Sequence, residues 1–161
     1  MAVVLFAAAC AQTAPYRPAS SGASPGFSDR KIETDRYQVA FRGDSRTPRE
    51  DVETYLLYRA AEVTVAEGGA LFQVVTSDTT ANTRYRTSII GTRFGYSPFR
   101  YSSFGSLSTF GDIRPVTRYE AVANILVLDG ERPARDGSVY DARDVLRTLG
   151  PSVRRPTPPS G

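Results

Sequence analysis

Alternation of apolar and polar positions predicts the first two strands of the chain. Tyr37, Val39 and Phe41 are separated by polar or small residues, which is the period-two pattern of a half-buried strand. Residues 71–76 show the same spacing, with Phe72 and Val74 on one face. The two predicted strands lie on either side of a segment with helical periodicity.

A longer apolar stretch over residues 117–128 predicts the central strand. Its odd-numbered positions from Tyr119 to Val127 form one apolar face, and the other face is partly apolar as well, as burial on both sides requires. Residues 84–90 are the candidate for one more strand. We therefore expect three to four strands.

The segment between the first two strands predicts a helix over residues 48–67. Thr47 to Glu50 has the composition of a capping box, in which Thr47 is the N-cap and Glu50 reaches back to it. Gly68 and Gly69 are expected to end the helix in the left-handed conformation. The apolar residues at helical spacing are Val52, Leu56, Ala60 and Val63.

A second, shorter helix is predicted over residues 141–149. Asp141 is its N-cap, and Gly150 with Pro151 ends it. Strands and helices in this order fit an α+β two-layer sandwich. The expected sheet is small, mixed or antiparallel, and carries the helices 48–67 and 141–149 on one face.

The first ten residues form an apolar run that ends in the only cysteine of the chain, Cys10. Small residues, Ala7 to Ala9, precede the cysteine, as at the cleavage site of a secretory signal. Residues 1–9 lack a basic region and are fewer than the roughly 15–30 residues of a complete signal. We therefore expect translation to begin upstream of Met1. The alternative is a cytosolic protein with a frayed apolar N-terminus.

This segment resembles the lipobox of bacterial lipoproteins, with Ala7 where leucine is usual. The resemblance implies that Cys10 is lipidated, with thioether-linked and amide-linked chains such as palmitate, and becomes the mature N-terminus. Ala11 stands where aspartate would retain an enterobacterial lipoprotein in the inner membrane. The expected location is therefore the cell envelope, on the outer membrane and facing the periplasm.

Composition divides the rest of the chain. Residues 10–30 are rich in Ala, Ser, Pro and Gly, which predicts a flexible tether behind the lipidated cysteine. Residues 31–150 are expected to form a single α+β domain. Residues 79–116 are predicted to be a long flexible insertion in it, mostly without secondary structure. Residues 151–161 are predicted to be a disordered Pro-rich tail.

The residue types present restrict the chemistry. The chain has no histidine, and its single cysteine is assigned to lipid, which excludes Ser-His-Asp and Cys-His catalysis, disulfides, and zinc or iron–sulfur sites. Acidic residues gather near the C-terminus, but without the order of an EF-hand. They are Asp129, Glu131, Asp136, Asp141 and Asp144. We predict a protein that is not an enzyme and that has no cofactor or metal. The alternative is an enzyme that uses only carboxylates, which would need two of Glu62, Glu120 and Asp129 in one pocket.

The net charge of +3 comes almost entirely from arginine, since Lys31 is the only lysine. This bias is more typical of a GC-rich genome than of phosphate recognition. Arginines and aromatics alternate over residues 84–101, and they form a weak candidate site for anionic lipid or glycan. The alternative is a disordered loop without a partner. The candidate residues are Arg84, Arg86, Arg93, Tyr96, Arg100 and Tyr101.

Arg59 and Glu62 lie three residues apart in the first predicted helix. They could present a polar pair to a ligand. The favoured interpretation is an i,i+3 ion pair in which Arg59 also ties the helix to the sheet edge.

Three short stretches resemble a family of small, uncharacterised alphaproteobacterial lipoproteins. They are Tyr-x-Val-x-Phe-Arg-Gly from Tyr37, Tyr-Arg-Ala-Ala-Glu ending at Glu62, and Tyr-Asp-Ala-Arg from Tyr140. The resemblance covers about residues 37–76 and 117–151. It implies an envelope location and no known reaction.

From these observations we expect a non-enzymatic lipoprotein with a structural or assembly role in the envelope. Its partners would be the membrane, through the anchor, and envelope lipids, glycans or proteins, but not nucleic acid. The alternative is a module that binds anionic lipid or glycan through residues 84–101.

Overall fold

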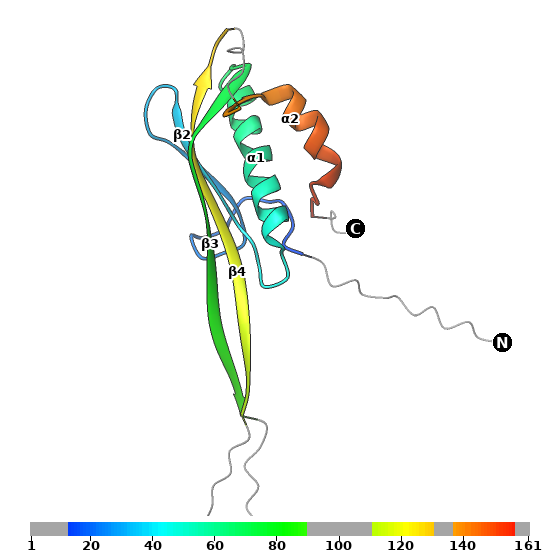
Figure 1. The fold of residues 1–161 in the computed structure, drawn as a ribbon. Helices are drawn as coiled ribbons and strands as arrows, with labels where there is room; N and C mark the ends of the chain where they lie inside the picture. Colours follow the sequence, from blue (N-terminus) through cyan, green and yellow to red (C-terminus); the bar gives the residue numbers. More distant parts are fainter. Residues whose placement is uncertain (1–12, 90–110, 131–136, 157–161) are drawn as a thin grey trace, which may run out of the picture. The chain divides into compact units, whose positions relative to one another are not determined.

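The computed structural model describes residues 13–89, 111–130 and 137–156 (Figure 1). They form one antiparallel sheet of five strands in the order β1-β2-β4-β3-β5, with two α-helices. The strands are β1 (Gly26–Lys31), β2 (Arg36–Arg42), β3 (Leu71–Ile89), β4 (Gly111–Leu128) and β5 (Val139–Asp141). The helices are α1 (Arg49–Ala66) and α2 (Ala142–Leu149), and a 3-10 turn, Gly150–Ser152, follows α2.

The chain divides into two compact units. One consists of Met1–Asn82 with Arg118–Gly161, and the other is Thr83–Thr117. In the second unit the hydroxyls of Thr83 and Thr117 lie 3.0 Å apart, on β3 and β4. The core described below belongs to the first unit.

The mixed α+β class predicted from the sequence is confirmed, but the expected three to four strands are too few. β1 comes from the segment expected to be a tether, and its polar sequence GFSDRK shows no alternation because it lies at the sheet edge. β5 has only three residues, which is too short for a periodic signal.

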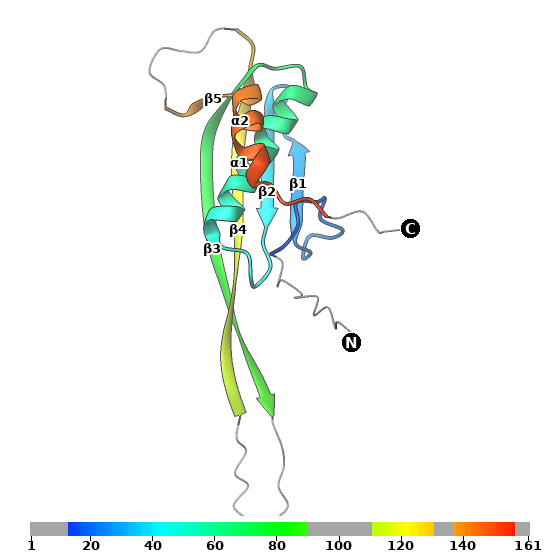
Figure 2. The same ribbon diagram turned by 90° about the vertical axis from the view of Figure 1, so that its right-hand side faces the viewer.

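Both helices lie on the same side of the sheet (Figures 1 and 2). The register pairs large residues of β2 with small or branched residues of β4, so that Phe41 lies opposite Ala121. Phe41 and Ala121 are fully buried, as is Tyr55 of α1. The rings of Phe41 and Tyr55 contact each other at 4.9 Å beside the small Ala121, and this packing removes apolar area from water.

The residues before β1 pack into this core instead of forming a flexible tether. Ala14 and Tyr16 are only 2% and 5% exposed. The backbone of Arg17 and Ala19 pairs with Phe27 at the start of β1, at 2.8 Å for each hydrogen bond. Of the residues predicted to be a flexible tether, 13–19 contact the core or β1, and 26–30 belong to β1. Buried Ala14 and Tyr16 and the backbone hydrogen bonds to Phe27 together dock a segment whose composition is otherwise typical of linkers.

The predicted capping box of α1 is not formed. The N-cap is Pro48, without a side-chain hydrogen bond, and Thr47 is buried. The Thr47 hydroxyl accepts the backbone N–H of Ala14 at 3.1 Å and donates to Asp44 at 2.8 Å. Thr47 therefore holds the N-terminal segment rather than the helix. At the other end, Gly68 has the expected left-handed conformation, with φ +85°.

The prediction for α2 is confirmed. The Asp141 carboxylate accepts the backbone N–H of Asp144 at 2.9 Å, as an N-cap does. The helix packs against α1 and ends at Leu149.

β3 and β4 are much longer than predicted. Residues 79–89 and 111–116, expected within a flexible insertion, belong to these strands. Exposed Ser and Thr residues on β3 remove the apolar alternation by which a strand is recognised in sequence. Residues 90–110 of the predicted insertion lie outside the described residues.

Gly26 gives a test of how the N-terminal segment docks. Its φ is +139°, and a Cβ there would lie 2.5 Å from the Arg17 carbonyl oxygen. We expect Gly26→Ala to lower the free energy of unfolding by about 1–3 kcal/mol, through strain and displacement of the segment. Urea denaturation of the full chain measures this. Gly22→Ala, where a Cβ meets nothing within 4 Å, is the matched control. Equal stability of the two variants would contradict the docking.

Candidate functional site at the junction of the two terminal segments

Two segments far apart in sequence meet on α1. The Tyr16 N–H donates to the Arg154 carbonyl at 2.7 Å, and the Arg154 N–H donates to the Tyr55 hydroxyl at 3.1 Å. The Arg154 guanidinium also donates to the Thr13 hydroxyl at 3.2 Å. We call residues 13–17 and 153–155, together with the α1 residues they touch, the terminal junction. Of the residues predicted to be a disordered tail, 151–152 belong to the 3-10 turn and 153–155 make these contacts.

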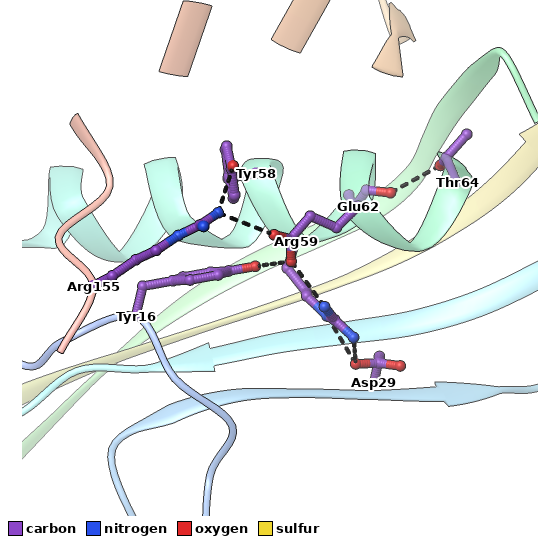
Figure 3. A network of polar contacts seen from close by, with 8 residues as sticks. Tyr16, Asp29, Tyr58, Arg59, Glu62, Thr64 and Arg155 are labelled. Atoms are coloured by element: carbon purple, nitrogen blue, oxygen red, sulfur yellow. Dashed lines mark hydrogen bonds and ion pairs between the residues drawn. The ribbon is translucent and has the colours of Figure 1, made fainter. Parts of the chain in front are cut away.

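Glu62 is the centre of the polar contacts in the terminal junction (Figure 3). Its Oε2 accepts the Tyr16 hydroxyl and, at 2.8 Å, the Arg59 guanidinium. Its Oε1 lies 3.7 Å from Arg155. The Glu62 side chain is 23% exposed, and it joins the N-terminal segment, α1 and the C-terminal segment.

Arg59 extends the network to the sheet. Its Nη2 lies 2.8 Å from Asp29 on β1, and its guanidinium stacks on the Phe27 ring at 4.2 Å. The favoured interpretation of Arg59 and Glu62 is confirmed: they form an i,i+3 ion pair, and Arg59 ties the helix to the sheet edge. In this arrangement the pair supports the fold rather than an open ligand site.

The Tyr16 hydroxyl is held in its neutral form. Burial, and then the hydrogen bond to the Glu62 carboxylate, raise the pKa of Tyr16 far above its usual range. The phenol therefore acts as a hydrogen-bond donor and is not available as a phenolate base or nucleophile.

The sheet face away from the helices carries a different set of polar groups. Arg42 of β2 and Glu120 of β4 are cross-strand partners with an ion pair at 2.6 Å. They line a half-open cleft of about 190 Å³ together with Ser21, Ser24 and Ser28. The cleft offers hydroxyls to a small polar molecule, but Glu120 already neutralises the charge of Arg42.

The sequence-predicted site residues are not brought together by the described structure. Arg84 is exposed on β3, and Arg86 also lies on β3. The other predicted residues lie outside the described residues: Cys10, Arg93, Tyr96, Arg100 and Tyr101. Lipidation of Cys10 and binding through residues 84–101 stay predictions.

Sequence reasoning missed the terminal junction. Tyr16, Arg154 and Arg155 fall in segments whose Ser and Pro content suggested tether and tail. The aromatic residue Tyr16 in the first segment and the Arg-Arg pair in the second were the available signals. Neither shows by itself that the segments pack together.

Comparisons with known proteins found no match among protein-family models, curated proteins or solved structures. In the parts of the chain that the structure describes, no three His, Cys, Asp or Glu residues are grouped so that they could hold a metal ion. No helix among the described residues has the length and apolar character needed to cross a membrane.

Removing Arg59 tests the energetic role of the network. Arg59→Gln leaves the half-buried carboxylates of Asp29 and Glu62 without their main partner, so we expect the free energy of unfolding to fall by about 1–3 kcal/mol. Urea denaturation measures this. Arg49→Gln, which breaks an exposed i,i+4 pair with Glu53, is the matched control and should change stability little. Similar losses in both variants would refute the structural role of Arg59.

The raised pKa of Tyr16 predicts an alkaline loss of stability. Above about pH 10 the unfolded chain releases the phenol proton while the folded chain keeps it, so stability falls as pH rises. We expect wild type to lose up to about 1.4 kcal/mol per pH unit more than Tyr16→Phe in this range. Urea denaturation between pH 8 and about pH 11 compares the two. The other tyrosines are common to both proteins, so parallel pH profiles would contradict the prediction.

Proposed function

We propose that the protein is a non-enzymatic lipoprotein whose α+β domain is held at the bacterial outer membrane, facing the periplasm, with a structural or assembly role. One observation carries the proposal. Cys10, at the end of an apolar run, lies four residues before Ala14, which is the first buried residue of the described chain. An acyl chain on Cys10 would therefore be attached almost directly to the folded domain.

Chain length limits how far the domain would stand from the membrane. Four residues span at most about 14 Å when fully extended. Because Ala14 and Tyr16 are fixed in the core, residues after Ala14 add no reach. The proposal thus places the terminal junction at the lipid surface. Two or more acyl chains would make this attachment stable, at about 0.8 kcal/mol per buried methylene.

The polar groups of the domain support a role without catalysis. The chain has no histidine, and an acylated Cys10 would leave no thiol. The half-buried carboxylates of Glu62 and Glu120 are engaged by arginines. General acid–base catalysis needs a group free to exchange a proton at the operating pH, and ion-paired carboxylates serve this purpose poorly.

Metabolic labelling of cells with radioactive palmitate tests the anchor. We expect the wild-type protein to carry label and to fractionate with the outer membrane, and Cys10→Ser to lose the label and leave the membrane fraction. No other cysteine can take over the acylation. An unlabelled wild-type protein, or unchanged fractionation of Cys10→Ser, would refute the proposal.

Ala11→Asp serves as the companion variant in the same experiment. It keeps Cys10, so the label should remain. Under the enterobacterial sorting rule, its membrane fraction should change from outer to inner. Label that is retained in Ala11→Asp and lost in Cys10→Ser would show that the loss is specific to the cysteine.

A further inference from the structure

Three arginines lie on the two segments that form the terminal junction. Arg17 directly follows the docked Tyr16, and Arg154 and Arg155 follow the 3-10 turn after α2. All three are exposed. The hydrogen bond between Tyr16 and Arg154 places the two segments side by side, so the three arginines lie on neighbouring stretches of backbone.

Most of the positive charge in this region is not neutralised by the protein. Among the described residues, Arg17 and Arg154 make no ion pair, and the Arg154 guanidinium contacts the uncharged Thr13 hydroxyl. Arg155 is paired with Glu62 at 3.7 Å, and its side chain is 63% exposed. Glu62 is already shared with Arg59, so it offsets the charge of Arg155 only in part.

Acidic residues limit the basic region to the terminal segments. The first turn of α1 carries Glu50 and Asp51, and Asp29 on β1 is paired with Arg59. A negatively charged surface would therefore be attracted to Arg17, Arg154 and Arg155 but not to the start of α1. This asymmetry favours one orientation of the domain.

The proposed anchor would bring a membrane to this region. Thr13, which bonds to Arg154, is three residues from Cys10, a distance of at most about 11 Å. This distance is close to the Debye length of about 8 Å at physiological ionic strength. The attraction between the arginine charges and an anionic lipid surface would therefore be only partly screened. Arginine guanidinium groups donate paired hydrogen bonds to phosphate oxygens.

We propose that Arg17, Arg154 and Arg155 form a docking surface for the phosphate headgroups of anionic phospholipids in the membrane that holds the anchor. The inference rests on the proposed function, because the proposed anchor is what would bring a membrane close. The attraction between arginine and phosphate depends only on the described residues. Each basic side chain near an anionic membrane raises the binding of a protein to that membrane about fivefold. Three arginines would therefore strengthen membrane binding strongly, and high salt would weaken it.

Vesicle co-sedimentation of the full chain carrying Cys10→Ser tests the surface without any acyl chain. The probes are vesicles of phosphatidylglycerol and vesicles of phosphatidylcholine. We expect binding to phosphatidylglycerol that is lost at high salt, and no binding to phosphatidylcholine. Arg17→Gln, Arg154→Gln and Arg155→Gln combined should weaken binding at least about 25-fold, the effect of losing two of the three arginines.

The matched control removes three exposed arginines from other elements. Arg30→Gln, Arg118→Gln and Arg143→Gln combined lower the net charge equally, on β1, β4 and α2. This variant should keep its affinity within about twofold, well below the effect of one arginine at the membrane. Equal weakening of both triple variants, equal binding to both vesicles, or no binding to phosphatidylglycerol would overturn the proposal.

Two further points keep the test decisive. If the Arg17, Arg154 and Arg155 triple variant unfolds at a lower urea concentration than wild type, the double variant Arg17→Gln with Arg154→Gln replaces it. The double variant leaves the contacts of Glu62 intact. Since the Cys10→Ser chain cannot be acylated, its vesicle binding is independent of palmitate labelling. Failure of the docking surface and failure of the anchor are therefore separate outcomes.

Discussion

The docking of Tyr16 onto α1 is the interaction on which the arrangement of the terminal segments depends. Its ring lies 4.7 Å from Phe27 and contacts Tyr55 and Tyr58 edge-on at 5.7 and 5.3 Å. Its hydroxyl reaches Glu62, so one side chain fills an apolar space and satisfies a half-buried carboxylate. This residue therefore supplies the aromatic part of the contacts that hold the first segment against the helix.

Docking at Tyr16 also determines what the protein could do at a membrane. A long flexible tether would let the domain sample many orientations, and its surface charges would matter little. A segment fixed four residues after Cys10 instead presents one end of the domain. The proposed anchor and the three arginines of the terminal segments would therefore act at the same place. The network around Glu62 joins the two terminal segments to α1 at this place.

The elements that could be predicted are those with their own amphipathic pattern. β2, α1, α2 and the inner part of β4 each bury one face, and this burial requires apolar residues at period two or 3.6. Asp141 could also be assigned, because its N-cap contact is local in sequence. Thr47 could not, because its hydroxyl is used by Ala14, which lies 33 residues away.

The sequence by itself determined the α+β class, the central strands and both helices, because short-range periodicity encodes them. It also gave the ion pair of Arg59 with Glu62, since residues three apart on a helix are neighbours. Only the tertiary structure decided how the terminal segments pack and that β1 and β5 are strands. Tyr16 meets Glu62 across 46 residues, and Arg154 meets Thr13 across 141, so no local pattern records either contact.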